Sequence, residues 1–337
     1  MPERPVLSES ARHSVWSGRS EVGRAEDGSG VVPIDDSLPH YERAGGIAGR
    51  LKSVGSDTMN NLMAGWTDGF RRLYPNVKTE IEGKGSGTAP TALIEGTASF
   101  GPMSRPLRPT EQDEFEDRFG YRATMLPTAV DMVGVYVHRD NPIVEIGLSF
   151  EQLDAAFSQT RFRGHREVMT WGQLGLQGYE DWENRPVSLY GRSAASGTYS
   201  FFKRTVLEDG DFKTNVKELS GSSSVVLGLA NDEFGLGYSG IGYKTQDVAL
   251  VPIRVERSDG AFLPKALNLT TYPLTRLLII AVNYEPNGEL DPLRREFVRF
   301  LMSAEGQEVV VREGFLPLSF DQARLAASRV GLDLQAR

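Results

Sequence analysis

Residues 191–198 read GRSAASGT, and they join a strand-like segment, residues 186–190, to a helix-like segment, residues 198–207. Arg192 arrives from the loop, and two hydroxyl side chains and a glycine open the helix. The first backbone N–H groups of a helix have no intrahelical partner, and the helix dipole makes that end positive. Together with an arginine, such a helix start favours an oxyanion. Taken alone, the stretch fits a serine cap beside a surface arginine equally well.

The same arrangement occurs twice earlier in the chain. Residues 56–58 read SDT and residues 86–88 read SGT, and each triplet stands where a predicted strand passes into a predicted helix. Strands that alternate with helices predict βα units and a largely parallel sheet, with function at the carboxyl ends of the strands. Three hydroxyl-bearing helix starts and Arg192 therefore favour one small anion as their common ligand.

Composition limits the class of protein. A chain of 337 residues with 39% hydrophobic and 24% charged residues is typical of globular domains, and its length suits two of them. The absence of cysteine excludes disulfides and thiolate metal sites. A net charge of −8 argues against nucleic acid as a partner. Residues 1–30 lack the apolar core of a signal peptide, which leaves open a cytoplasmic chain or one whose export signal has been removed.

Hydrophobic periodicity gives the expected elements. Residues 1–46 show no sustained period and are predicted to form a flexible N-terminal arm, laid on the domain near residues 33–41. Trp66, Phe70, Phe201 and Phe202 follow helical spacing and are predicted to be core residues. The expected helices include residues 59–73, 110–118, 150–157, 198–207, 222–230, 291–302 and 304–313, and one that follows residues 83–88 and includes residues 93–94. The expected strands cover residues 51–54, 77–81, 122–127, 131–138, 186–190, 248–255 and 276–282.

Six short segments, in chain order, carry a family resemblance: Gly55-Ser56-Asp57-Thr58-Met59, Gly85-Ser86-Gly87, Phe100-Gly101-Pro102-Met103-Ser104-Arg105, Arg192-x-x-x-Ser196-Gly197-Thr198, Gly235-Leu236-Gly237-Tyr238 and Tyr272-Pro273-Leu274. They resemble the periplasmic phosphate-binding proteins of Pst-type ABC importers over about residues 50–320. The resemblance implies an α/β, two-lobed periplasmic-binding-protein fold, type II-like. Each lobe would be a mixed sheet flanked by helices, with the ligand in the cleft between them.

The resemblance also implies a division of the chain and a function. Residues 47–138 and 265–337 would form the first lobe, and residues 139–264 the second. The chain would bind inorganic phosphate by lobe closure, in the periplasm or another extracytoplasmic space, and deliver it to the membrane permease of an ABC importer. We expect a monomer, and no metal or organic cofactor is implied.

Site residues follow from the matching positions. In the first lobe, Thr58 would give its hydroxyl, Met59 its backbone N–H and Ser86 a hydrogen bond from the second helix start. Arg192 would pair with the phosphate oxygens. The second lobe would add three further donors, namely Ser196, Gly197 and Thr198.

One position departs from the family pattern. The best-known members carry an Asp where this chain has Ser104, and that Asp accepts the proton of hydrogen phosphate and so rejects sulfate. This chain resembles a branch in which the segment reads Ser-Arg, with Ser104 as a donor. Arg105 is either a second cation for the anion or an exposed residue beside Pro106, and we expect it to be exposed. Asp131 and Asp57 are the candidate replacement acceptors, with Asp131 ranked first because it begins a predicted strand. The alternatives are a strand-end turn for Asp131 and a helix cap for Asp57.

The sequence lacks the motifs of an enzyme that acts on phosphate. The four histidines are scattered and form no metal-binding pattern, and neither a Walker loop nor a nucleophile elbow is present. A phosphatase is therefore not expected. Two alternatives keep the fold: a binding protein for another tetrahedral oxyanion such as sulfate or molybdate, and a phosphate scavenger or adhesin that serves no transporter.

Overall fold

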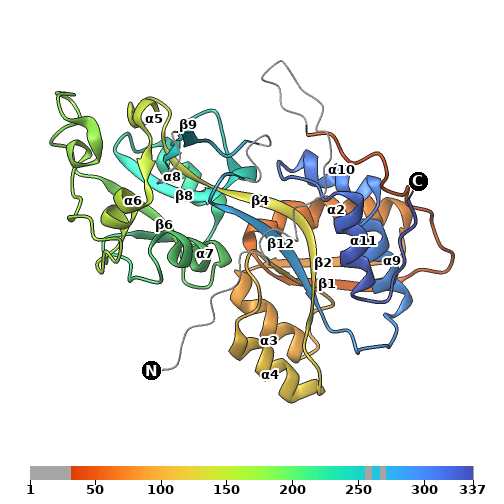
Figure 1. Cartoon of the computed structure of the whole chain (residues 1–337). Coiled ribbons are helices and arrows are strands. Elements are labelled where there is room, and N and C mark those ends of the chain that lie inside the picture. The colour runs from red at the N-terminus through yellow and green to blue at the C-terminus, as the bar shows by residue number, and fades with distance from the viewer. Residues whose placement is uncertain (1–31, 255–259, 266–270, 337) are drawn as a thin grey trace.

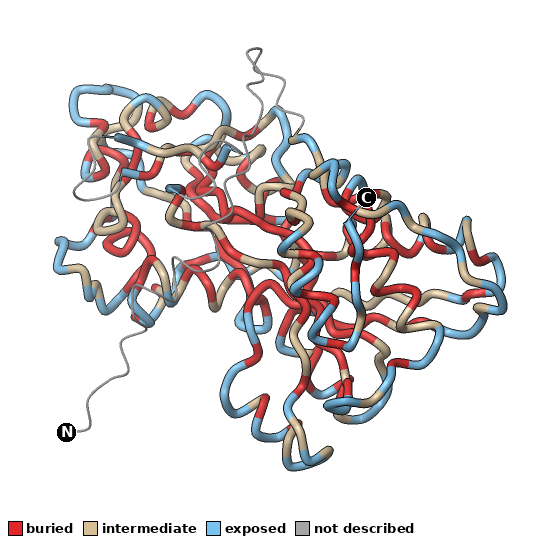
Figure 2. The backbone as a smooth tube through the Cα atoms, turned by 45° about the vertical axis from the view of Figure 1, so that its right-hand side comes forward, coloured by how far each residue is buried: buried red, intermediate tan, exposed pale blue. Residues whose placement is uncertain are grey.

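The computed structural model describes residues 32–254, 260–265 and 271–336. Two α/β lobes lie side by side and are joined by long strands (Figure 1). None of the described helices has the length and apolar character needed to cross a membrane. Buried residues follow the strands through the middle of the molecule, and exposed residues lie mainly on the outer loops and helix faces (Figure 2).

The first lobe begins with β1 (Gly49–Gly55), which runs parallel to β2 (Val77–Gly83). Between them α2 (Asn60–Leu73) buries Leu62, Met63, Trp66 and Phe70 at spacings of one helical face, as the periodicity predicts. The other described elements of this lobe are η1 (Asp57–Met59), η2 (Ser86–Thr88), α3 (Ala89–Ile94), β3 (Gly101–Met103), α4 (Pro109–Phe119), α9 (Pro292–Leu301), α10 (Ala304–Arg312) and α11 (Phe320–Ser328).

The second lobe is built around β6 (Ser188–Arg192) and β8 (Gly235–Gly240), which pair in parallel. The predicted core positions Phe201 and Phe202 are buried in α7 (Gly197–Val206). The other described elements here are α5 (Ile143–Ile146), β5 (Leu148–Ser149), α6 (Phe150–Phe157), η3 (Gly172–Leu176), β7 (Lys217–Leu219), α8 (Ser222–Ala230), η4 (Ile241–Tyr243), β9 (Val248–Leu250), β10 (Ile253–Arg254) and β11 (Ala261–Phe262).

Two strands connect the lobes. β4 (Thr124–His138) pairs with β12 (Thr275–Val282) over its first part and with β8 over its second, both antiparallel. The resulting strand order is β3-β12-β4-β8-β6-β7, with β9 also on β4. The expectation of a largely parallel sheet is therefore wrong, and the two strands expected at residues 122–127 and 131–138 are one. β4 is buried along nearly its whole length, and the polar residues in its middle, Thr128 and Asp131, are buried with it, although in the sequence they look like a break between two strands.

Residues 32–46 lie against the first lobe, as predicted for residues 33–41. Leu38 is buried, Asp35 accepts a hydrogen bond from the Phe320 N–H at 2.8 Å, and Pro39 accepts one from Ala304 at 2.9 Å. The remainder of the predicted arm, residues 1–31, lies outside the described residues.

Candidate anion site between the lobes

The 191–198 stretch forms a strand end and a helix start. Arg192 is the last residue of β6 and is fully buried, so its assignment to a loop was wrong. A strand end fixes the backbone more firmly than a loop and so aims the guanidinium. Ser196 is the N-cap of α7, and its hydroxyl accepts a hydrogen bond from the Thr198 N–H at 3.1 Å.

The three helix starts converge, as their shared sequence pattern predicts. Thr58 from the first lobe and Thr198 from the second bring their hydroxyl oxygens to 3.1 Å from each other. The Gly87 N–H donates to the carbonyl of Ala195 at 3.1 Å, also across the lobes. The site is therefore made by both lobes at once.

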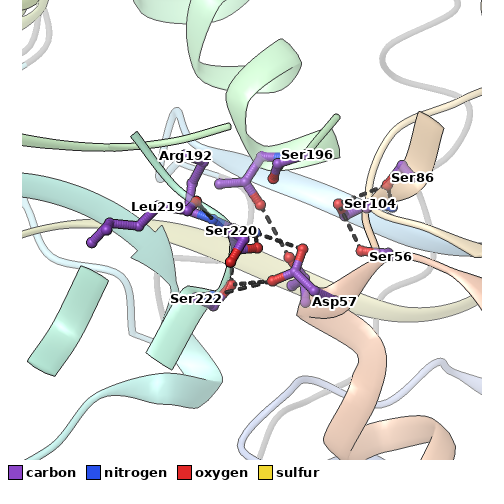
Figure 3. Close-up of polar contacts among 12 residues, drawn as sticks. Ser56, Asp57, Ser86, Ser104, Arg192, Ser196, Leu219, Ser220 and Ser222 are labelled. Atoms are coloured by element: carbon purple, nitrogen blue, oxygen red, sulfur yellow. Dashed lines mark hydrogen bonds and ion pairs between the residues drawn. The ribbon is translucent and has the colours of Figure 1, made fainter. Parts of the chain in front are cut away.

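One side of the site is a cluster of neutral hydroxyls (Figure 3). Ser56 donates to Ser104 at 3.1 Å, and the hydroxyl oxygens of Ser86 and Ser104 lie 3.2 Å apart. Gly197 packs directly on this hydroxyl cluster, because a Cβ added there would lie 2.4 Å from both the Ser86 and the Ser104 oxygens. Close approach of the second lobe thus requires a glycine at this position.

The other side is a charged cluster around Arg192 (Figure 3). Arg192 Nη2 lies 2.5 Å from Asp57 Oδ1, and Nη1 donates to the Ser222 hydroxyl at 2.6 Å. Nη2 and Nε also donate to the carbonyls of Ser220 and Leu219, at 3.0 and 3.3 Å. The Ser222 N–H at the start of α8 donates to Asp57 Oδ2 at 3.1 Å. Asp57 therefore ties the first lobe to the cation of the second.

Asp131 forms a second buried ion pair. It faces Arg276 across the β4–β12 ladder, and Arg276 donates to Oδ2 from Nε at 2.9 Å and from Nη2 at 2.7 Å. Burial raises the pKa of the Asp131 carboxyl, while the guanidinium opposes that rise by favouring the ionised form. Asp131 Oδ1 accepts a longer bond from the Ile241 N–H at 3.4 Å. Asp131 thus lies beside the threonine pair but is already held by a cation.

Neither Arg276 nor Ser222 was predicted from the sequence to belong to the site. For Arg276 a signal was present: it is the one charge in the otherwise apolar strand β12, TRLLIIAV. A charge in a strand buried on both faces needs a partner. For Ser222 the position alone, at the start of a helix, was too common a feature to be informative.

Met59 and Arg105 make contacts other than those predicted from the sequence. Met59 is buried in the core, and its N–H donates to the Ser56 carbonyl at 3.2 Å, so that donor is used within the turn. Arg105 was expected to be exposed, which is wrong: it is 5% exposed and donates to both carboxylate oxygens of Glu111, at 2.6 and 2.7 Å. The first turn of α4 supplies Glu111, a partner that is not evident from Arg105 and its neighbours in the sequence.

The assembled groups suit anion binding. Hydroxyls, helix starts and two arginines meet in a buried region where each hydrogen bond gains strength from the low dielectric. Among the described residues, no group of three or more His, Cys, Asp or Glu is placed to hold a metal ion.

Comparison with known proteins places the chain in a family. Residues 42–305 match the model of a PBP superfamily domain. A phosphate-binding protein PstS from Pseudomonas aeruginosa is 48% identical over 309 residues, which cover 90% of this chain and 94% of the relative. The chain belongs to the PstS family. A PstS from Staphylococcus haemolyticus is 24% identical and covers 77% of this chain and 79% of its own length.

Solved structures agree with the two-lobed fold. An ABC-type phosphate transport receptor from Vibrio cholerae has a TM-score of 0.60 at 21% identity, covering 80% of this chain and 100% of its own. A phosphate binding protein from Stenotrophomonas maltophilia has a TM-score of 0.61 at 14% identity, covering 83% and 94%. The predicted family, the periplasmic-binding-protein fold and the assignment to PstS binding proteins rather than enzymes are confirmed. The lobe boundaries and the ligand contacts of the site residues stay predictions.

Proposed function

We infer that this protein binds inorganic phosphate for an ABC-type phosphate importer. Membership of the PstS family supports this function. The observation that locates the binding site is that three helix starts meet beside a buried arginine, Arg192. Helix starts supply N–H donors, serines and threonines supply hydroxyls, and Arg192 supplies charge. The ligand would contact both lobes.

The proposed contacts are those expected from the sequence. Thr58, Ser86 and Ser104 serve the first lobe, and Arg192 with residues 196–198 serves the second. Asp131 is the proposed acceptor of the phosphate proton, and its closeness to Thr58 supports it: a Cβ on Gly240 would lie within 3.4 Å of both side chains. The Met59 N–H stays a candidate donor only if its turn bond to Ser56 lengthens.

Lobe closure is the proposed mechanism. A ligand that touches both lobes binds the closed arrangement more tightly than the open one and so raises its population. The closed surface would then be recognised by the membrane permease. We further propose a periplasmic or other extracytoplasmic location and a monomer, with residues 47–138 and 265–337 in one lobe and residues 139–264 in the other.

A different tetrahedral oxyanion is the alternative that one observation favours, because Ser104 replaces the usual acceptor Asp. Isothermal titration calorimetry with phosphate and with sulfate, at one pH below and one above the second ionisation of phosphate, separates the two. Phosphate binding that sulfate does not compete for supports the proposal. Tighter binding of sulfate at both pH values would identify another oxyanion, and turnover of a chromogenic phosphate ester would overturn the binding-protein assignment.

A further inference from the structure

Arg276 differs from Arg192 in how its donors are used. Arg192 has every guanidinium nitrogen hydrogen-bonded to protein. Arg276 uses Nε and Nη2 on Asp131, and Nη2 also donates to the Thr198 hydroxyl at 2.9 Å. Within the described part of the chain, its Nη1 is buried and has no hydrogen-bond partner. An arginine side chain that is 4% exposed thus keeps one whole –NH₂ group unused.

Buried polar groups are normally paired, so an unpaired one calls for an explanation. The other groups around Arg276 point to a ligand. Arg276 donates to the Thr198 hydroxyl, whose oxygen lies 3.1 Å from the Thr58 hydroxyl oxygen. Both threonines are predicted phosphate donors, and they come from opposite lobes. The guanidinium also lies over the ring of Phe201, 5.4 Å from its centroid, on the helix that begins at Gly197. Arg276 is therefore held in place at the junction of the two lobes.

Rigidity matters here because a planar guanidinium binds an oxyanion best when it is already oriented. Asp131 and Phe201 together fix the plane of Arg276, and β12 fixes its base. The fixed side chain leaves a charge-assisted donor free, and such donors are about twice as strong as neutral ones.

We propose that Arg276 is a second phosphate-contacting arginine, which donates Nη1 to a ligand oxygen while Nε and Nη2 hold Asp131. The inference rests on the proposed function, since it adds a contact to the same site. Each arginine is then paired with one carboxylate, Arg192 with Asp57 and Arg276 with Asp131. The site presents directed N–H donors without a large net positive charge.

The test is calorimetry with phosphate on wild type, Arg276→Gln, Asp131→Asn and the double variant, with Arg163→Gln as control. Arg163 is a largely buried arginine of the second lobe that donates to the carbonyls of Thr205 and Val206, at the far end of α7 from the site. Arg276→Gln is expected to weaken phosphate binding roughly 10- to 100-fold, as loss of a charge-assisted hydrogen bond predicts. The control should stay within about twofold, because it lies away from every proposed donor.

The double variant decides between a direct contact and a structural role. If Arg276 only neutralises Asp131, the double variant binds phosphate as tightly as Asp131→Asn alone, which would overturn the proposal. If Arg276 touches phosphate, the double variant binds more weakly than Asp131→Asn. Thermal unfolding without phosphate checks the folding of each variant. If Arg276→Gln leaves Asp131 without its cation and so fails to fold, the double variant, which removes both charges of this pair, still gives the answer when compared with Asp131→Asn.

The wild-type titration separates this inference from the proposed function. Wild type that does not bind phosphate contradicts the proposed function. Wild type that binds phosphate, together with Arg276→Gln that binds it within about twofold of wild type, contradicts only the role of Arg276.

Discussion

The charged cluster and the hydroxyl cluster lie on opposite sides of the same site, and they are built by different rules. Around Arg192, each contact joins a fixed donor to a fixed acceptor, and Asp57 lies 2.5 Å from the guanidinium. Around Ser104, the contacts of 3.1 and 3.2 Å join hydroxyls, each of which can donate or accept. The charged side chains and the hydroxyl cluster are both buried, yet only the charged side chains require their partners.

The two clusters differ in the free-energy cost of removing one side chain. A buried charge without its counter-charge is destabilised by several kcal/mol, whereas a serine hydroxyl can turn to another neighbour. The charged cluster should therefore set whether an anion binds at all. The hydroxyl cluster should set how closely the two lobes approach and can adapt to the ligand.

The largest effect is expected from Arg192→Ala. It leaves the Asp57 carboxylate buried without its cation and removes the main cation proposed for phosphate. Breaking a buried pair costs about 3–5 kcal/mol, so phosphate affinity in calorimetry should fall roughly a hundredfold or more. Unchanged affinity would assign Arg192 a purely structural role and leave Arg276 as the ligand's cation.

A smaller effect is expected from Gly197→Ala on the hydroxyl side. The new Cβ would lie 2.4 Å from the Ser86 and Ser104 oxygens and so would hold the lobes apart. Overpacking costs about 1–3 kcal/mol, which predicts roughly 5- to 100-fold weaker phosphate binding. Small-angle scattering with saturating phosphate should show a larger radius of gyration than wild type.

Gly87→Ala is the matched control for that steric effect. It adds the same methyl group to the same interface, but the nearest atom, the Ala195 carbonyl oxygen, would be 3.5 Å away, an ordinary contact. Its affinity should stay close to wild type. Equal losses in the two variants would show that something other than the contact at Gly197 limits closure.

The smallest effect is expected outside the site, where Glu82 forms ion pairs with two lysines at the partly exposed surface of the first lobe. Lys52 and Lys84 lie 2.6 and 2.9 Å from the Glu82 carboxylate, and their hydrogen bonds lower the pKa of Glu82 to about 2. Because the folded pKa lies below the unfolded one, this stabilisation is present above the ordinary pKa of Glu. It is lost as pH falls through about 2.

Urea unfolding of Glu82→Gln and wild type from neutral pH downward measures that loss. Wild type should be slightly more stable at neutral pH, and the difference should shrink below the ordinary pKa of Glu. A difference that does not change with pH would mean that packing, not charge, explains it. Solvent screening keeps the effect small beside that of a buried pair.

Much of the fold and the site was predictable because it depends on local pattern. The helix starts at residues 56–58, 86–88 and 196–198 are where expected, since a helix start depends mainly on residues near in sequence. Of the three, only Ser196 caps its helix with a side-chain hydrogen bond. The cation at Arg192 was predicted from the same stretch. The single strand β4 was not, because a strand that changes partner midway looks like two strands when only neighbours are considered.

What the sequence alone determined is the chemistry: hydroxyl-bearing helix starts, an arginine beside one of them, and the family that carries them. The pairing of charges depends on the tertiary structure. Asp131 and Arg276 are 145 residues apart in the sequence, and Asp57 and Ser222 are 165 residues apart. Arg105 is buried against Glu111 of α4, a helix that begins after it in the sequence. Partners chosen by packing leave no local pattern, because burial and sheet register, not sequence spacing, select them.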